Sequence, residues 1–409
     1  MTRSRLHLRS HALLFAAGVV LLLAYAGFVA LDHYRGYQRA EAGQAPLFTD
    51  FTSTYAGSVL LRYEPAHNLY VPERMLLADY YAANAAYDFK LTEAQIHQHH
   101  YAAWMYPPPY SLLILPLARI PYLWAFISWS IAGLTLYLLA LWLNHHRSSV
   151  GVGLAAPSTL FNLGYGQTGF FSAGLIGIGL NLLQRHPTLA GVVIGLAAFK
   201  PHLGLLIPLA LAAGGYWWVF TTASAVVLAL VASTTLAFGW SHWSAFLDSI
   251  TASFAGIGSG AYLYQPMITP VGWAKFYGAS NLAAWSFHLA VGTLAALLVW
   301  KYWRHSANNN HRLPLKAALL CAATLLTTPL AYLYDLTLLG LALAWLYTDM
   351  RDHPGPRHHG YQLAGIGIVM LALYPAAWQA EIHFGPLPAV LTLALCLQRW
   401  RIMPAGKPA

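Results

Sequence analysis

The stretch GLAAFKPHLGLLIPLALAA, residues 195–213, consists of two apolar runs separated by Lys200, Pro201 and His202. Each run is much shorter than the roughly 20 residues that a helix needs to cross a bilayer. Proline ends the first run because it lacks a backbone donor and clashes with the preceding helical turn. The stretch therefore predicts two short membrane helices joined by a turn that carries a cation.

The rest of the chain has the same membrane character. The 409-residue sequence is 58% hydrophobic and 9% charged, and its mean hydropathy of +0.51 lies far above that of soluble domains. Apolar runs of about 20 residues, such as 216–238 and 282–303, recur along the chain. Transmembrane β-barrels lack such runs. The 23 prolines and 33 glycines break other apolar segments, which hydrocarbon tolerates only where helices or a watery cavity satisfy the freed backbone. We therefore expect an all-α polytopic membrane protein, a helix bundle with a cavity, formed by residues 1–409 as a single domain.

Hydropathy predicts about 12 spans, several of them short. Residues 110–120 are interpreted as a re-entrant or interfacial helix, because this apolar piece is short and is closed by Pro121. The predicted spans are 12–31, 122–143, 150–161, 169–183, 189–199, 203–213, 216–238, 282–303, 315–330, 336–347, 361–378 and 388–397.

The distribution of basic residues predicts the orientation. If Arg3, Arg5 and Arg9 hold the N-terminus in the cytoplasm, the long polar stretch 32–108 lies outside, and residues 109–400 form the multi-span bundle. The basic breaks within that bundle then also fall on the cytoplasmic side. This threading places Lys200 at the rim of a cavity that opens outward.

Other polar interruptions reach the same outer side from distant parts of the sequence. Ionisable groups at membrane depth are costly and usually functional, so this convergence predicts a site. A carboxylate and a cation there suit a reaction in which a hydroxyl attacks and a phosphate leaves, with the carboxylate as general base. The residues concerned are Asp50 and Asp335 as candidate bases, Lys200 and His202 as phosphate ligands, and Asn162, Gln167, Tyr106 and Tyr334 as cavity residues.

Several stretches, in this order, resemble the landmarks of glycosyltransferase family 87, over roughly residues 32–339. Their order after a large outer loop makes the resemblance specific. The stretches are TDFTSTYAGSVLL at 49–61, YPPPYSLLILPLARIPYLWAF at 106–126, NLGYGQTGFFSAGLIGIGL at 162–180, AGVVIGLAAFKPHLGLLIPLAL at 190–211 and YLYDLTLL at 332–339.

The resemblance implies a GT-C type fold, with a large extracytoplasmic first loop that carries short helices. It also implies an enzyme of the bacterial plasma membrane that takes a sugar, typically mannose, from a polyprenyl-phosphate donor on the outer face with inversion. The family's catalytic aspartate falls on Asp50 and its lysine on Lys200. The acceptor is left open as a glycolipid, a polysaccharide or a protein. No cofactor is expected, and a divalent metal is possible but not required.

Structural roles compete with each of these assignments. Asp50 also suits the start of an amphipathic helix, Lys200 a snorkelling position at the interface, and Asp335 the N-terminus of a helix. Asn162 and Gln167 also suit a tight turn that Gly164 and Gly166 permit.

Other protein classes fit less well. A polytopic transporter or lipid flippase of envelope biogenesis predicts paired charges near mid-membrane in an internal repeat, which the sequence lacks. A non-catalytic scaffold is the third alternative. The net charge of +9 does not indicate nucleic-acid binding, because no basic patch with interleaved aromatics occurs. His97, His99 and His100 are interpreted as a solvated patch rather than a metal site.

Overall fold

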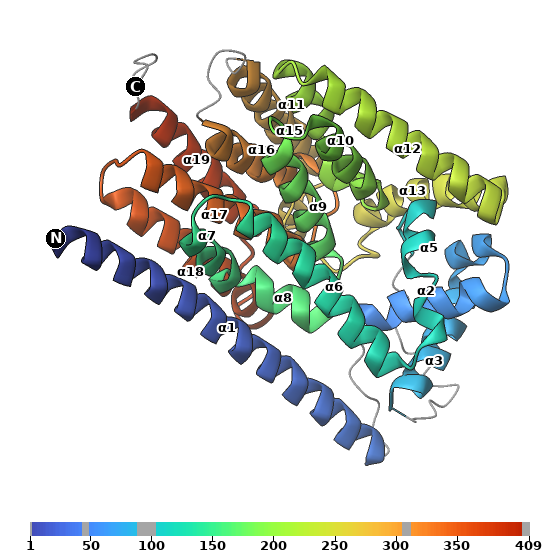
Figure 1. The fold of residues 1–409 in the computed structure, drawn as a ribbon. Coiled ribbons are helices and arrows are strands. Elements are labelled where there is room, and N and C mark those ends of the chain that lie inside the picture. Colours follow the sequence, from blue (N-terminus) through green and yellow to red (C-terminus); the bar gives the residue numbers. More distant parts are fainter. Residues whose placement is uncertain (1, 43–48, 88–103, 305–311, 403–409) are drawn as a thin grey trace.

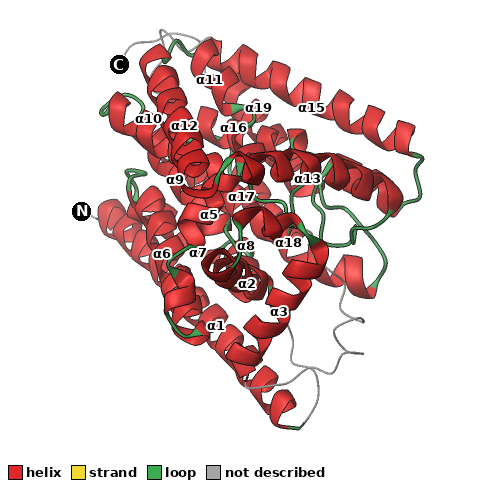
Figure 2. Cartoon of the chain, turned by 90° about the vertical axis from the view of Figure 1, so that its right-hand side faces the viewer, coloured by secondary structure: helices red, strands yellow, loops and turns green. Residues whose placement is uncertain are grey.

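The computed structural model describes residues 2–42, 49–87, 104–304 and 312–402. Every regular element in these ranges is a helix, and the pairing between Met267 and Tyr332 is an isolated β-bridge (Figures 1 and 2). The expectation of an all-helical polytopic bundle is therefore confirmed. His97, His99 and His100 lie outside the described residues.

The first helix is longer than the predicted span. Helix α1 covers Thr2–Glu41, 40 residues, or about 60 Å at 1.5 Å per residue, which exceeds the thickness of the hydrocarbon core. It lies against α7 (Arg147–Ala155), where a Cβ on Gly18 would stand 2.5 Å from the Gly151 carbonyl oxygen. The outer stretch thus does not begin as a loop at residue 32, because the helix continues through it.

Five helices are long and apolar enough to cross a membrane: part of α1 and all of α6 (Tyr122–Trp142), α12 (Trp217–Phe238), α15 (Asn281–Arg304) and α18 (His358–Gln379). The count of about 12 spans is not confirmed, because the other predicted spans form shorter helices. These are α9 (Gly169–Leu182), α10 (Pro187–Leu196), α11 (Ile207–Ala213), α16 (Leu313–Thr327), α17 (Thr337–Asp352) and α19 (Leu387–Ile402).

The expected span at 150–161 is wrong as a single helix. The chain forms α7 and then α8 (Ser158–Tyr165), with Pro157 between them. Proline does not continue the first helix, because it cannot donate the next backbone hydrogen bond. The break matters for the site, because it places the end of α8 beside α2.

Helices α16 and α17 form the buried centre of the bundle. Every residue from Leu315 to Leu326 in α16 is buried, as is every residue from Thr337 to Leu346 in α17. These stretches are mainly apolar on all faces, although α16 also buries Lys316, and such helices fit a position with neighbours on every side. The turn between these two helices, residues 328–336, therefore leads directly from the core to the cavity described below.

A group of short helices occupies one end of the molecule, away from both termini (Figure 1). It comprises α2 (Asp50–Tyr63), the 3-10 helix η1 (Ala66–Tyr70), α3 (Pro72–Tyr87), α5 (Pro108–Ile114) and the 3-10 helix η2 (Leu117–Arg119). Short helices are thus present within the predicted first loop, residues 32–108, and the position of this stretch outside the membrane stays a prediction. The break of α5 at Pro116 agrees with the expected non-spanning helix at 110–120.

Two helices between residues 239 and 281 were not expected. Helix α13 (Trp240–Ser259) buries His242 and Phe246 and exposes Trp240 and Phe254, and α14 (Pro270–Phe276) follows it. The polar residues on α13 keep its mean hydropathy below that of a membrane span, so the sequence of this helix does not contain a long apolar run. The loop that joins the two helices borders the cavity.

Candidate active site

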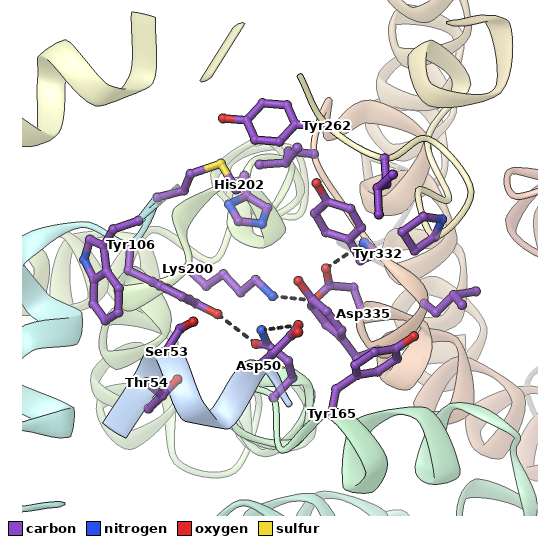
Figure 3. A pocket seen from close by; sticks show the side chains of 18 of the residues that line it. Asp50, Ser53, Thr54, Tyr106, Tyr165, Lys200, His202, Tyr262, Tyr332 and Asp335 are labelled. Carbon is purple, nitrogen blue, oxygen red and sulfur yellow. Dashed lines mark hydrogen bonds and ion pairs between the residues drawn. The ribbon is translucent and has the colours of Figure 1, made fainter. Parts of the chain in front are cut away.

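A cavity of about 520 Å³ lies between the short helices and the core (Figure 3). Its wall combines two carboxylates, a lysine, a histidine and a ring of aromatic side chains contributed by segments far apart in the sequence. The lining residues are Asp50, Ser53, Thr54, Trp104, Met105, Tyr106, Tyr165, Gln167, Lys200, His202, Ala261, Tyr262, Leu263, Pro266, Leu330, Tyr332, Leu333, Tyr334, Asp335, Tyr374 and Trp378.

Helix α2 presents Asp50 to this cavity. Asp50 is its first residue, and Ser53 and Thr54 follow on the same face, as helical spacing requires. On the opposite side, Phe51 is fully buried and its ring meets those of Tyr122 and Phe126 edge-on at 5.4 and 5.3 Å. This aromatic anchor fixes the start of the helix, and therefore the position of the carboxylate.

The turn after α8 brings Gln167 to Asp50. Gly166 adopts a left-handed conformation with φ +62°, which L side chains rarely tolerate. A Cβ there would also stand 2.6 Å from the Phe51 Cβ. Its carbonyl accepts a hydrogen bond from the Trp129 indole at 3.1 Å. The expected special turn is thus present at Gly166, and it directs the next side chain into the cavity.

Gln167 connects three elements through hydrogen bonds. Its Nε2 donates to Asp50 Oδ2 at 2.8 Å. Its Oε1 accepts from the Tyr106 hydroxyl at 2.8 Å and from the Thr168 backbone N–H at 3.1 Å. Tyr106 is held in turn by a stacked contact with Tyr110, with ring centroids 3.9 Å apart. Both Gln167 and Tyr106 therefore line the cavity, and their contact with a substrate stays a prediction.

The environment of Asp50 favours its protonated form relative to a carboxyl in water. Burial raises the pKa of Asp50 to about 6, against the opposing effects of the Gln167 hydrogen bond and the Lys200 charge, while the Asp335 charge raises it further. A carboxylate with a pKa in this range is ionised at neutral pH and still basic enough to accept a proton. A general base needs such a pKa, and the assignment of Asp50 to that role stays a prediction.

Lys200 and Asp335 form a buried ion pair on another wall of the cavity. Lys200 Nζ lies 2.5 Å from Asp335 Oδ1, and the two side chains are only 5% and 1% exposed. Lys200 precedes the 3-10 helix η4 (Pro201–Gly204), so the predicted break does place the cation at the cavity. Asp335 also accepts the Tyr332 backbone N–H at 3.1 Å through its second oxygen. Asp335 therefore caps this turn and also lines the cavity, and its part in a reaction stays a prediction.

His202 and Tyr334 complete the predicted set. His202 lines the cavity two residues after Lys200, on the same 3-10 turn (Figure 3). Tyr334 lies beside the Lys200 ammonium, which stands 4.8 Å from the centroid of its ring. A cation over an aromatic face is attracted to the ring, so Tyr334 helps to hold Lys200.

Asn162 is the predicted cavity residue that the structure does not bring into the lining. It is 2% exposed within α8, and its backbone carbonyl accepts the Gln167 backbone N–H at 3.2 Å. Its side chain points to Gly169, since a Cβ there would lie 2.5 Å from Asn162 Oδ1. The turn-forming role considered for this residue is therefore its role in the structure.

Several cavity residues carry no signal that sequence reasoning used. Ser53 follows Asp50 by three positions, so helical spacing alone could have identified it. Tyr262 comes from the loop after the unexpected α13, and Tyr374 and Trp378 come from α18, where aromatics are ordinarily assigned to the membrane interface. Their contribution depends on how distant helices pack.

Among the described residues, no group of three or more His, Cys, Asp or Glu side chains is arranged to hold a metal ion. The expectation that the reaction needs no metal remains a prediction. The charges that the cavity does provide are one carboxylate held by an amide and one lysine paired with a second carboxylate. This set can remove a proton from a hydroxyl and compensate negative charge on a neighbouring group.

The sequence model of glycosyltransferase family 87 matches residues 104–331, more than half of the chain. No match was found among curated proteins or among solved structures. The chain therefore belongs to glycosyltransferase family 87 and is a membrane glycosyltransferase, rather than a transporter or flippase.

Proposed function

We propose that this family 87 glycosyltransferase moves mannose from a polyprenyl-phosphate donor to an acceptor hydroxyl, with Asp50 as general base. The acceptor oxygen attacks the anomeric carbon from the side opposite the phosphate, so the configuration inverts. The bond between that carbon and the phosphate oxygen breaks, and its electron pair leaves with polyprenyl phosphate. The hydroxyl proton goes to Asp50.

One observation carries this proposal: Asp50 is a half-buried carboxylate held by Gln167 in the same cavity as Lys200. Phosphate is a good leaving group, so it needs charge stabilisation more than a second carboxylic acid. A single base facing a single cation therefore suits this donor class. The same pair would have no evident use in an enzyme that must protonate an alcohol leaving group.

Lys200 is the proposed phosphate ligand, with His202 beside it. An ammonium group has three N–H donors, and Asp335 is the hydrogen-bond acceptor of Lys200 Nζ among the described residues. The other donors can therefore serve a phosphate oxygen without first releasing Asp335. The aromatic residues near the two groups exclude water, which strengthens such charge contacts.

A lipid-linked donor is supported by the wall that α18 contributes. Tyr374 and Trp378 line the cavity and are still 42% and 43% exposed, on a helix apolar enough to span the membrane. The cavity wall therefore continues onto a surface that faces lipid. A polyprenyl chain in the bilayer would reach the charged end of the cavity along this wall.

The acceptor is proposed to be a glycolipid, a polysaccharide or a protein that enters beside Trp104 and Tyr106, where flat aromatic faces suit sugar rings. The proposed location is the outer face of the bacterial plasma membrane. This sidedness is testable with topology reporters: one at Asn308 should report the cytoplasm, and one at Glu73 the exterior. The reverse result would place the cavity on the wrong side for this donor pool.

The decisive experiment is transfer of labelled mannose from polyprenyl phosphate mannose by membranes that contain the wild type or Asp50→Asn at equal expression. The wild type should transfer and Asp50→Asn should lose about 10²–10⁴-fold in rate, the range for general-base catalysis. Asp248→Asn is the matched control, because Asp248 is exposed on α13. Equal rates for both variants would remove Asp50 as the base, and no transfer by the wild type would refute the donor.

A further inference from the structure

Gln167 has an amide group whose orientation is determined by its neighbours. Three hydrogen-bonding groups point at its Oε1: the Tyr106 hydroxyl at 2.8 Å, the Thr168 backbone N–H at 3.1 Å and the Thr168 hydroxyl at 3.5 Å. A hydroxyl can donate or accept, but the backbone N–H of Thr168 can only donate, so an amide nitrogen at that position would face a donor that it cannot accept from. The NH₂ group must therefore point the other way, where it meets Asp50 Oδ2 at 2.8 Å.

This arrangement leaves the two oxygens of Asp50 in different positions. Oδ2 accepts the Gln167 amide, which is the hydrogen bond made by the Asp50 side chain among the described residues. A carboxylate that is tied at one oxygen and anchored through its helix keeps the other oxygen directed into the cavity. Gln167 is itself only 8% exposed, so little of its surface remains for contact with a substrate.

We infer that Gln167 is a positioning residue: it presents one fixed oxygen of Asp50 to the acceptor hydroxyl and keeps the carboxyl group ionised, with Tyr106 as the group that fixes the amide. This inference rests on the proposed function for the identity of the acceptor reaction. It goes beyond the sequence-based expectation, in which Gln167 is a cavity residue or part of a tight turn.

The charged and titratable groups around Asp50 set the direction of the expected changes. Lys200 lowers the pKa of Asp50, and Asp335 raises it. The other groups that face Asp50 are phenols and one histidine: Tyr106, Tyr110, Tyr165, Tyr332, Tyr334 and His202. The phenols remain neutral near pH 7, so Gln167 supplies the hydrogen bond whose loss must raise the pKa of Asp50.

Three variants test the inference in a graded series. Gln167→Met removes the hydrogen bond and should move the Asp50 titration upward by about one to two pH units, as expected for a hydrogen bond to a charged group. Gln167→Glu matches glutamine in shape but adds a second carboxyl, so it should move the titration further upward. Tyr106→Phe only loosens the amide and should produce the smallest upward shift.

The measurement is infrared titration of the Asp50 carboxyl in purified protein, with the Asp50→Asn spectrum subtracted, beside the pH profile of mannose transfer. A base must be ionised, so the acid limb of activity should follow the same midpoint and move to higher pH. Gln184→Glu is the control, because it makes the same substitution at an exposed position at the end of α9 and should leave both midpoints unchanged.

The outcomes separate this inference from the proposed function. Identical infrared midpoints in the wild type, Gln167→Met and Gln167→Glu would overturn the positioning role. If the midpoints shift in the variants but the wild type transfers no mannose, the contact between Gln167 and Asp50 is upheld and the mannose reaction is overturned. A purely structural role predicts the reverse of the expected order, since glutamate is the closest mimic of glutamine and should then disturb least.

Discussion

Two buried ion pairs lie at opposite ends of the core, and they differ in what they do for the protein. At the cavity, Lys200 meets Asp335, and at the opposite end of the same core helices Arg399 meets Asp349, with Arg399 Nε 2.7 Å from Asp349 Oδ2. All four side chains are at most 5% exposed. Burial and charge therefore do not distinguish the two pairs, although the first lines the cavity described above.

The difference lies in hydrogen-bonding capacity. Arg399 also donates to the backbone carbonyls of Asp349 and His353 at 2.9 and 2.6 Å and lies 3.4 Å from His359 Nδ1. Its guanidinium thus ties α17, α18 and α19 together and has little capacity left. Lys200 donates to Asp335 alone among the described residues and faces open space. Unused donors that face a cavity, rather than a buried charge as such, indicate a binding site.

The largest expected effect breaks the Arg399 pair. Arg399→Gln leaves Asp349 buried without its cation, which costs about 3–5 kcal/mol of stability. Thermal unfolding in detergent should show a large drop in midpoint, while the rate per folded molecule stays near that of the wild type. A variant that unfolds like the wild type but transfers no mannose would assign Arg399 to the reaction instead.

The next effect separates function from stability at the cavity. Lys200→Gln should reduce mannose transfer by about 10²–10³-fold, the typical cost of losing one group that stabilises developing charge. Some stability is also lost because Asp335 loses its partner, so rates must be normalised to folded protein. Transfer at the wild-type rate would show that Lys200 serves Asp335 alone.

A smaller effect sharpens the role of Asp335. Asp335→Asn keeps an oxygen for the Tyr332 N–H but removes the negative charge beside Lys200. Lys200 should then attract an anionic donor more strongly, so the KM for the donor should fall. The fall should be up to about tenfold, which corresponds to a change of about 1.4 kcal/mol in the binding free energy of the donor. Donor titrations at fixed acceptor measure this change. An increase in KM would mean that Asp335 orients Lys200 rather than opposing phosphate.

The smallest effect uses a third ion pair as a reference. His146 Nε2 lies 2.7 Å from Asp352 Oδ1, but these side chains are 32% and 43% exposed. Exposed pairs contribute about 0–1 kcal/mol, so His146→Gln should shift the thermal midpoint little and leave the KM for donor unchanged. A loss comparable with that of Arg399→Gln would contradict the link between burial and the importance of these pairs.

The sequence predicted the class of fold and the charged residues that line the cavity, because those features depend on local patterns. Lys200 interrupts an apolar run, and Gln167 follows a glycine-rich turn, so both can be identified in one dimension. The pairing of Lys200 with Asp335 cannot, since 135 residues separate them. The contact between Gln167 and Asp50 likewise depends on a left-handed Gly166 packed against Phe51. Helix α13 was not predicted from the sequence because its exposed face contains both polar and apolar residues.

The order of the cavity residues along the chain has a consequence for how the protein is made. Lys200 is synthesised 135 residues before Asp335, which at 5–20 residues per second is a delay of about 7–27 s. During membrane insertion the lysine must therefore stay near water or lipid headgroups until its counterion arrives. The delay is longer for Asp50 on α2, because the cavity wall is complete only after Trp378 has been synthesised. The cavity of a nascent chain is thus incomplete, and we expect activity only after the helix bundle has assembled.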